Sequence, residues 1–240
     1  MALEGAGKLA GKAAIVTGGS RGIGKAVAAA YAGEGARVLI CGRKGDDVER
    51  AVDEIRRGGS EVYGLTGDVG IPDDARRIVR ETLARFGDID VLVNNASLLG
   101  PRLAIVDYPF SSWVEVLKIN LNGIFLMTQE VLKAMIPRRR GSIINVSSGV
   151  GRVGKANWGA YGPSKFAVEG FTQMLAEEAW PFGIRVNALN PGATRTEMRA
   201  AAYPEEDPLT LPKPEDITEQ FVYLASDESS GVTGRSLDAR

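Results

Sequence analysis

The chain of 240 residues is 44% hydrophobic and 25% charged, which suits one large α/β core and gives no sign of disorder. Its 30 acidic and 29 basic residues nearly cancel, so no overall field would draw in nucleic acid or an anionic membrane. With one cysteine and no histidine, an internal disulfide, a Ser-His-Asp triad and an HExxH metal helix are excluded, and we expect no metal site.

The N-terminal residues MALEGAGKLAGK lack the apolar segment of a signal peptide. No stretch of the chain approaches the roughly 18 consecutive apolar residues that span a bilayer. We therefore expect a soluble, cytoplasmic protein that acts on a small molecule and has neither nucleic acid nor membrane as a partner.

Short β-branched apolar runs alternate with longer helical patterns from Ala13 to Ala225. This alternation predicts an α/β, doubly wound Rossmann fold, a parallel sheet of about seven strands with helices on both faces. Strands are expected over residues 13–17, 36–41, 61–65, 90–93, 142–146, 184–189 and 236–238. Helices are expected over residues 22–33, 46–57, 72–86, 111–136, 161–180 and 215–225.

We expect residues 1–240 to form a single domain that binds a dinucleotide and carries the catalytic residues, with an N-terminal tail over residues 1–11. The segment 195–213 contains three prolines and no sustained apolar period. It is interpreted either as a substrate lid or as a surface excursion.

The first expected strand runs directly into a glycine loop, Thr17-Gly18-Gly19-Ser20-Arg21-Gly22-Ile23-Gly24, and then into an alanine-rich helix. Glycines let the backbone approach a pyrophosphate, and the helix start offers unpaired N–H groups to the anion. The spacing is G-x-x-x-G-x-G, which in isolation would also suit an ordinary turn. In its strand-loop-helix context the loop predicts a dinucleotide site.

The end of the second expected strand bears on the choice of dinucleotide. An NAD-selective site would place an acid there to bind the ribose 2′-hydroxyl, whereas this strand continues into Arg43 and Lys44. Together with Arg21 in the glycine loop, these cations suit a 2′-phosphate, so NADP(H) is favoured. The alternative is that Arg43 and Lys44 are merely solvated.

Further motifs follow in order: Asp68-Val69, Asn94-Asn95-Ala96, Asn120, Ser148, Tyr161-x-x-x-Lys165, and Pro191-Gly192 with Thr196. With the glycine loop, they make the chain resemble the short-chain dehydrogenase/reductase family over essentially its full length, and within it the NADPH-dependent 3-oxoacyl reductases. Ser148 stands 13 residues before Tyr161, the separation typical of the family. The resemblance implies that the protein is an enzyme.

The resemblance implies a catalytic set of Asn120, Ser148, Tyr161 and Lys165. Ser148 would bind the substrate oxygen, and Tyr161 would donate its proton as hydride reaches the carbonyl carbon. Because the reference pKa of tyrosine is near 10, a cation must stabilise the phenolate, and Lys165 lies on the same helical face. Asn120 would hold a proton-relaying water, or would be a buried amide bonded only to backbone.

Other implied roles concern the cofactor. Lys165 would also bind the nicotinamide ribose, Asp68 and Val69 the adenine, and the segment around Pro191 the carboxamide. The expected cofactor contacts are Gly18, Ser20, Arg21, Gly22, Ile23, Gly24, Arg43, Asp68, Val69, Asn94, Ala96, Tyr161, Lys165, Pro191, Gly192, Thr194 and Thr196. Ser97 replaces the glycine that usually follows Asn-Asn-Ala, and the chain ends on Ser236-Leu237-Asp238-Ala239-Arg240 rather than on the family's common Asp-Gly-Gly.

The main hypothesis is an NADP(H)-dependent reductase of a ketone or 3-oxoacyl carbonyl. The alternatives are an NADP-dependent alcohol or sugar dehydrogenase working in the oxidative direction and a non-catalytic NADPH sensor, although a sensor should have lost the acid/base residues. Candidate substrate contacts, which suggest a largely apolar substrate, are Leu98, Leu99, Trp158, Met198 and Tyr203.

Partners are predicted less directly. The resemblance implies a homodimer or homotetramer formed through the helices that contain Asn120 and Lys165. Arg138-Arg139-Arg140 would be either part of a docking patch for an acyl carrier protein or a solvated cluster at a helix end. Phe182 stands where the carrier reductases tend to have a basic residue, which argues against a carrier.

Overall fold

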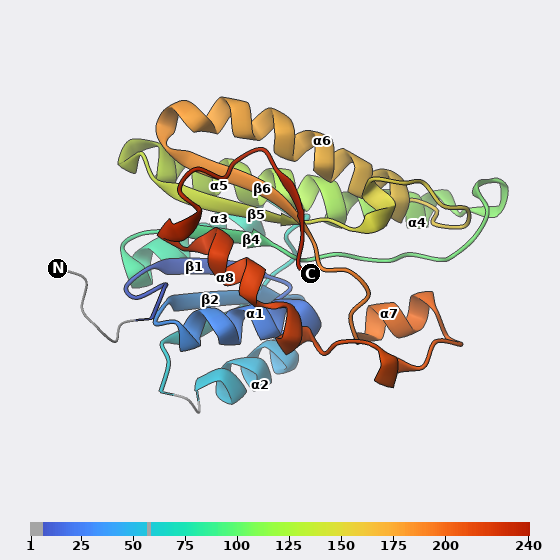
Figure 1. Ribbon diagram of the computed structural model, residues 1–240, viewed down its shortest axis with the longest axis horizontal. Coiled ribbons are helices and arrows are strands. Elements are labelled where there is room, and N and C mark those ends of the chain that lie inside the picture. Colours follow the sequence, from blue (N-terminus) through green and yellow to red (C-terminus); the bar gives the residue numbers. More distant parts are fainter. Residues whose placement is uncertain (1–6, 57–58) are drawn as a thin grey trace.

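The computed structural model describes residues 7–56 and 59–240, and its centre is a seven-stranded parallel sheet (Figure 1). The strands are β1 (Ala13–Thr17), β2 (Arg37–Gly42), β3 (Val62–Thr66), β4 (Val91–Asn94), β5 (Gly141–Val146), β6 (Ile184–Asn190) and β7 (Ser236–Asp238). Their order across the sheet is β3-β2-β1-β4-β5-β6-β7. All five residues of β1 are buried, as expected for a parallel strand covered on both sides.

The helices pack on both faces of the sheet, so the predicted doubly wound Rossmann fold is confirmed (Figure 1). One face is covered by α1 (Gly22–Gly33), α2 (Gly45–Arg56) and α8 (Glu219–Ala225), whose apolar residues join one core cluster. The opposite face is covered by α3 (Pro72–Phe86), α5 (Gly123–Arg138) and α6 (Tyr161–Ala179). None of the described helices is long and apolar enough to cross a membrane.

Four helices differ from their predicted bounds, and the smallest difference is that α6 ends at Ala179, one residue before the expected Trp180. The helix expected over residues 111–136 is divided into α4 (Phe110–Leu117) and α5 by a π-helical segment, Lys118–Asn122. The helix expected over residues 215–225 begins as a 3₁₀ turn, Pro214–Ile217, before α8. The expected last residue of the second helix, Arg57, lies outside the described residues, and α2 is described to Arg56.

The expected tail and lid segments contain structure of their own. Residues 1–6 of the tail lie outside the described residues, but Leu9 is fully buried in the core beside α1 and β2. The segment 195–213 contains α7 (Glu197–Ala202), whose first turn is capped by the Thr196 hydroxyl accepting from the Arg199 N–H at 3.1 Å. Capping of this kind starts a helix where the apolar pattern gives little sign of one.

The strand order reverses between β1 and β4, because the chain passes from β3 at one edge back across β1 to β4. In open α/β sheets, a crevice forms outside the carboxyl ends of the strands at such a switch point. The glycine loop after β1 and the Asn-Asn-Ala segment after β4 therefore meet there.

Candidate active site

A cleft of about 710 Å³ opens at this switch point. Most of the expected cofactor residues line it, namely Gly18, Ser20, Arg21, Gly22, Ile23, Arg43, Asp68, Val69, Ala96, Tyr161, Lys165, Pro191 and Thr196. A smaller cavity of about 100 Å³ adjoins it and is lined by Ser148, Gly192 and Thr194 as well as Tyr161. Gly24, Asn94 and Asn120 line neither cavity.

The glycine loop is held close to the segment after β4. Gly18 has φ +64°, a conformation that favours glycine, and a side chain there would lie 2.9 Å from the Ala96 Cα. Gly24, in the first turn of α1, lies under the loop: a Cβ at this position would be 2.4 Å from both Asn95 Nδ2 and the Gly18 carbonyl oxygen. Gly24 thus shapes the cradle from beneath, it is not among the residues that line the cleft, and its contact with the cofactor stays a prediction.

Asn95 was not among the predicted site residues, although it stands inside the Asn-Asn-Ala motif. Its amide donates to the carbonyl oxygens of Thr17 at 2.9 Å and Gly18 at 3.1 Å. In return, the Thr17 hydroxyl accepts from the backbone N–H groups of Asn95 at 3.0 Å and Ala96 at 3.1 Å. These four bonds fasten the glycine loop to the neighbouring strand end.

Asn94 faces the interior of the sheet layer, which agrees with the partly structural, sheet-bracing role that the family resemblance implies for it, while its contact with the cofactor stays a prediction. It is 2% exposed, and its amide donates to Thr128 Oγ1 at 3.1 Å and Asn145 Oδ1 at 2.9 Å. Because side chains alternate across a strand, the last residue of β4 points into the sheet's packing and only the next residues reach the loop. Asn94 therefore braces β4 against β5 and α5.

The cations expected at the adenosine end do line the cleft, and each has a carboxylate beside it. Arg21 Nη1 lies 2.5 Å from Glu197 Oε2 of α7, and Arg43 Nη1 lies 3.7 Å from Glu115 Oε1 of α4. All four side chains are at least half exposed, so these pairs contribute little to stability and the arginines remain accessible to an anion. Asp68, further along, is held by Lys118 at 2.9 Å.

Tyr161 and Lys165 lie in the first turns of α6, beside Ser148, which stands two residues after the end of β5. Tyr161 is 8% exposed, and burial raises the pKa of its hydroxyl to about 12 while a hydrogen bond with Ser148 acts in the opposite direction. The Lys165 ammonium donates to the Val146 carbonyl oxygen at 2.8 Å and lies 5.4 Å from the centroid of the Tyr161 ring. Burial lowers the pKa of Lys165 to about 8, and the negative charge of Glu169 opposes that shift.

Asn120 is fully buried in the π-helical segment between α4 and α5. Its carbonyl oxygen accepts from the Leu98 N–H at 2.7 Å, and its amide donates to the Leu98 carbonyl at 2.9 Å and to Ser164 Oγ at 3.1 Å. The alternative of an amide bonded only to backbone is therefore wrong, because one partner is a side chain of α6. Asn120 connects the loop after β4 to the helix that carries Tyr161 and Lys165.

A series of polar side-chain contacts, not predicted from the sequence, connects Ser147, the residue before Ser148, with β7. Ser147 Oγ donates to Glu169 Oε1 at 2.5 Å, and Glu169 lies 3.5 Å from Arg152 Nε. Arg152 in turn binds both carboxylate oxygens of Asp238 on β7, at 2.8 and 3.0 Å. The site is thus tied to the last strand of the sheet by partners far apart in the sequence.

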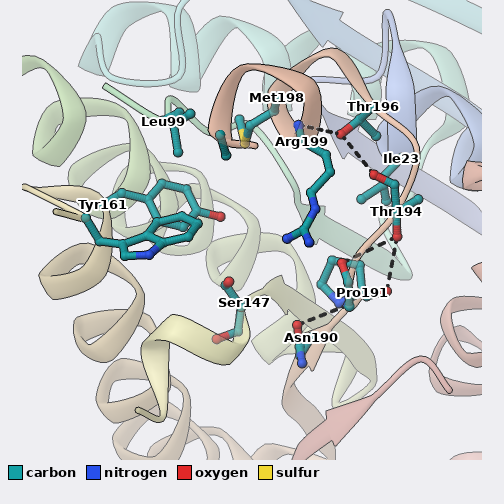
Figure 2. A pocket seen from close by; sticks show the side chains of 14 residues that line it. Ile23, Leu99, Ser147, Tyr161, Asn190, Pro191, Thr194, Thr196, Met198 and Arg199 are labelled. Carbon is teal, nitrogen blue, oxygen red and sulfur yellow. Dashed lines mark hydrogen bonds between the residues drawn. The ribbon is translucent and has the colours of Figure 1, made fainter. Parts of the chain in front are cut away.

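The smaller cavity lies where the predicted substrate residues were expected (Figure 2). Leu99, Trp158 and Met198 line it, whereas Leu98 lines only the larger cleft. Tyr203 lines neither and packs behind Trp158, with the ring centroids 6.1 Å apart. Arg199 of α7, which the sequence analysis missed, also lines this cavity.

The arginine triplet before β5 lies away from the site, at the amino end of that strand. Arg138 lies 3.0 Å from Asp88 and 3.2 Å from Asp90, and Arg140 lies 3.2 Å from Asp90. Arg139 donates to the Pro181 carbonyl at 2.7 Å. Because the cleft opens at the carboxyl ends of the strands, a carrier docking patch, which must lie near the pocket mouth, does not include the triplet, and the alternative of a cluster at a helix end fits its position.

Comparison with known proteins gives one consistent assignment. The family model for short chain dehydrogenase matches residues 12–207. The uncharacterized oxidoreductase YciK of Escherichia coli is 37% identical over 94% of this chain and 90% of its own. The 3-oxoacyl-[acyl-carrier-protein] reductase FabG of Aquifex aeolicus is 36% identical over 95% of each chain.

Solved structures agree with this assignment. A short chain dehydrogenase from Salmonella enterica superposes with a TM-score of 0.94 at 37% identity over 98% of both chains. A Shigella flexneri protein solved in complex with NADP superposes with a TM-score of 0.93 at 36% identity, over 98% of this chain and 99% of its own. The chain therefore belongs to the short chain dehydrogenase family and is an oxidoreductase.

Proposed function

We propose that the protein reduces a ketone or 3-oxoacyl carbonyl to a secondary alcohol with NADPH, using Tyr161 as the proton donor. The observation that carries this proposal is the placement of three groups. Ser148, Tyr161 and the buried ammonium of Lys165 meet where the large cleft joins the small cavity. A carbonyl in the small cavity would have its oxygen near the hydroxyls of Tyr161 and Ser148.

The walls of the large cleft fit a nicotinamide dinucleotide. Side chains at Gly18 and Gly24 would collide with Ala96 and Asn95, so the two glycines let the loop pack closely in the shape that a pyrophosphate cradle needs. The Ser97 hydroxyl is buried, lines the cleft and has no hydrogen-bond partner among the described residues, so it is available to a ligand. Residues of the glycine loop would hold the pyrophosphate, and Lys165 the nicotinamide ribose.

The choice of NADP(H) over NAD(H) rests on the end of β2. Arg43 stands there in place of an acid, and Arg21 lines the same cleft. Guanidinium groups make charge-assisted bonds to a 2′-phosphate. Structural relatives from Shigella flexneri and Escherichia coli were solved with NADP and NADPH, which supports the same choice.

Tyr161, Lys165 and Ser148 have different roles in the proton transfer. NADPH, when bound, supplies a hydride, which the carbonyl carbon accepts while the carbonyl oxygen takes the proton of Tyr161. With a pKa raised to about 12, the hydroxyl is fully protonated at neutral pH and ready to donate. The phenolate that remains is stabilised by the Lys165 cation and by the hydrogen bond with Ser148.

We also propose a homo-oligomer formed through the helices around the site. Large apolar side chains are exposed along α4, α5 and α6: Phe110 and Val114, Phe125, and Phe166 and Met174. Exposed apolar surface of this kind, spread over adjoining helices, is typical of a face covered by another copy of the chain.

The Tyr161→Phe variant tests the mechanism. We expect turnover to fall by at least about 10²-fold while folding and NADPH affinity stay nearly unchanged, because only the proton donor is removed. Turnover is followed by the loss of NADPH absorbance over a panel of ketones and 3-oxoacyl thioesters, and affinity by NADPH fluorescence. Substantial activity of the variant on the best substrate would refute the role of Tyr161.

A further inference from the structure

The small cavity beside Tyr161 has one charged group in its wall. Of the described residues that line it, Arg199 alone is ionised at neutral pH. Figure 2 shows its side chain running from α7 into the cavity, across from the ring of Tyr161 and near Pro191. A cation on this side faces the position that a substrate must occupy when its carbonyl lies against Tyr161.

Arg199 is held in this position by groups that lie outside the cavity wall. Its Nε and Nη2 each donate to one carboxylate oxygen of Glu206, both at 2.6 Å. Its guanidinium carbon lies 3.9 Å from the centroid of the Tyr203 ring. A bidentate bond together with a stacked ring fixes the guanidinium plane, so little further entropy is lost when a second anion binds its remaining edge.

The other walls sharpen the effect of this charge. Leu99, Trp158 and Met198 line the cavity with apolar groups, and in such surroundings an electrostatic contact is stronger than in water. Arg102 lies behind the wall, with its guanidinium 4.4 Å from the centroid of the Trp158 ring. No carboxylate is found among the described residues that line the cavity.

We infer that this site takes small oxo acids, with the substrate carboxylate on Arg199 and the carbonyl on Tyr161 and Ser148. This inference rests on the proposed reductase function and names its substrate class. The carboxylate of Glu206 does not cancel the attraction, because a substrate anion in contact with the guanidinium is closer to it than to the carboxylate on its far edge. From the sequence we expected a largely apolar substrate, and the position of Arg199 changes this expectation to a substrate with an anionic end.

The test compares acids with uncharged molecules of the same shape. Catalytic efficiency with NADPH is measured for 2-oxo, 3-oxo and 4-oxo acids of four or five carbons and for the corresponding primary amides. The native enzyme is compared with Arg199→Met and Arg199→Lys, and with Arg76→Met as a control for removing a remote, half-exposed arginine on α3. Binding of the same acids to the enzyme–NADP⁺ complex is measured by calorimetry, independently of turnover.

We expect at least one acid to exceed its amide by roughly 10- to 100-fold in kcat/KM, mostly through KM, as a charge-assisted hydrogen bond implies. Arg199→Met should abolish this preference, Arg199→Lys should restore part of it, and Arg76→Met should leave it intact. Equal kcat/KM values for acids and amides in the native enzyme, or a preference for acids that survives in Arg199→Met, would overturn the inference. If acids bind but no carbonyl compound is reduced, the reductase proposal fails while the carboxylate site stands.

Discussion

Glu169 offers a direct test of how Lys165, the proposed partner of Tyr161, keeps its charge. It lies one helical turn after Lys165 on α6, is 8% exposed, and accepts a hydrogen bond from Ser147. Its negative charge raises the pKa of Lys165, against the larger effect of burial, which leaves that pKa at about 8. A Glu169→Gln change keeps the shape and an acceptor for Ser147 but removes the charge.

The size of the effect follows from the separation of the two charges. The Cβ atoms of residues four apart on a helix lie about 6 Å from each other, and two unit charges at that separation would interact by about 2.8 kcal/mol at an effective dielectric constant of about 20. An interaction of this size corresponds to a change of about two units in the pKa of Lys165. Arg152 lies 3.5 Å from Glu169 and offsets part of its charge, so we expect the pKa of Lys165 to change by about one to two units. Loss of a negative neighbour lowers the pKa of Lys165.

The direction of the pH effect follows from which form of Lys165 is active. Lys165 is charged below its pKa and neutral above it, so carbonyl reduction should decline as the pH rises through about 8. In Glu169→Gln the decline should begin about one to two pH units lower. Tyr161, with a pKa of about 12, stays protonated over this range and adds no second step.

The assay is the pH dependence of kcat/KM for the carbonyl substrate at saturating NADPH between pH 5 and pH 10, with thermal unfolding to confirm the fold. Glu177→Gln, an exposed change on the same helix, is the matched control and should follow the native profile. An unchanged midpoint in Glu169→Gln, or one moved to higher pH, would show that Glu169 does not support the charge of Lys165.

Three further predictions concern the cofactor and the substrate carrier. Gly24→Ala should weaken NADPH binding at least about tenfold, because the new Cβ would lie 2.4 Å from both Asn95 Nδ2 and the Gly18 carbonyl oxygen. NADPH fluorescence measures the affinity, and Gly33→Ala is the control because no atom lies within 4 Å of a Cβ at that position. Arg43→Asp should narrow or reverse the preference for NADPH over NADH while barely changing NADH turnover, and equal efficiencies with both cofactors in the native enzyme would count against the role of Arg43. An acetoacetyl group should be reduced from coenzyme A at least as efficiently as from acyl carrier protein, because the triplet at Arg138 is paired with Asp88 and Asp90 far from the cleft; a strong, salt-sensitive preference for the carrier form would contradict this.

Local patterns in the sequence were enough to predict the scaffold and most of the residues that line the candidate site. Each strand is a short apolar run and each major helix has a recognisable start or end, such as Pro72 in the first turn of α3 and Gly87 at φ +78° after it. Tyr161 and Lys165 could be paired because four residues make about one helical turn. The order of the motifs along a parallel sheet then brought the loops after β1 and β4 to the same edge.

Contacts between distant residues were decided only by the tertiary structure. Asn95 is neighbour to a predicted residue, but its bonds to Thr17 and Gly18 cross 78 and 77 positions. Arg152 meets Asp238 across 86 positions, and nothing in either local sequence indicates the pairing. Asn94 faces away from the cleft for a related reason, since strand alternation and the packing of Thr128 and Asn145 choose its direction.

Some features could be predicted from the sequence and others could not, because the interactions that determine them act over different separations along the chain. Backbone conformation, capping and helical spacing depend on neighbours within a few residues, so the sequence alone determined the α/β fold and the positions of the proposed acid/base pair along the chain. The pKa of Lys165, the turn of Arg199 into the cavity and the fastening of the glycine loop depend on burial and on charges brought from other elements. Those surroundings exist only once the chain is folded, and they decide how the predicted residues are charged and which way they face.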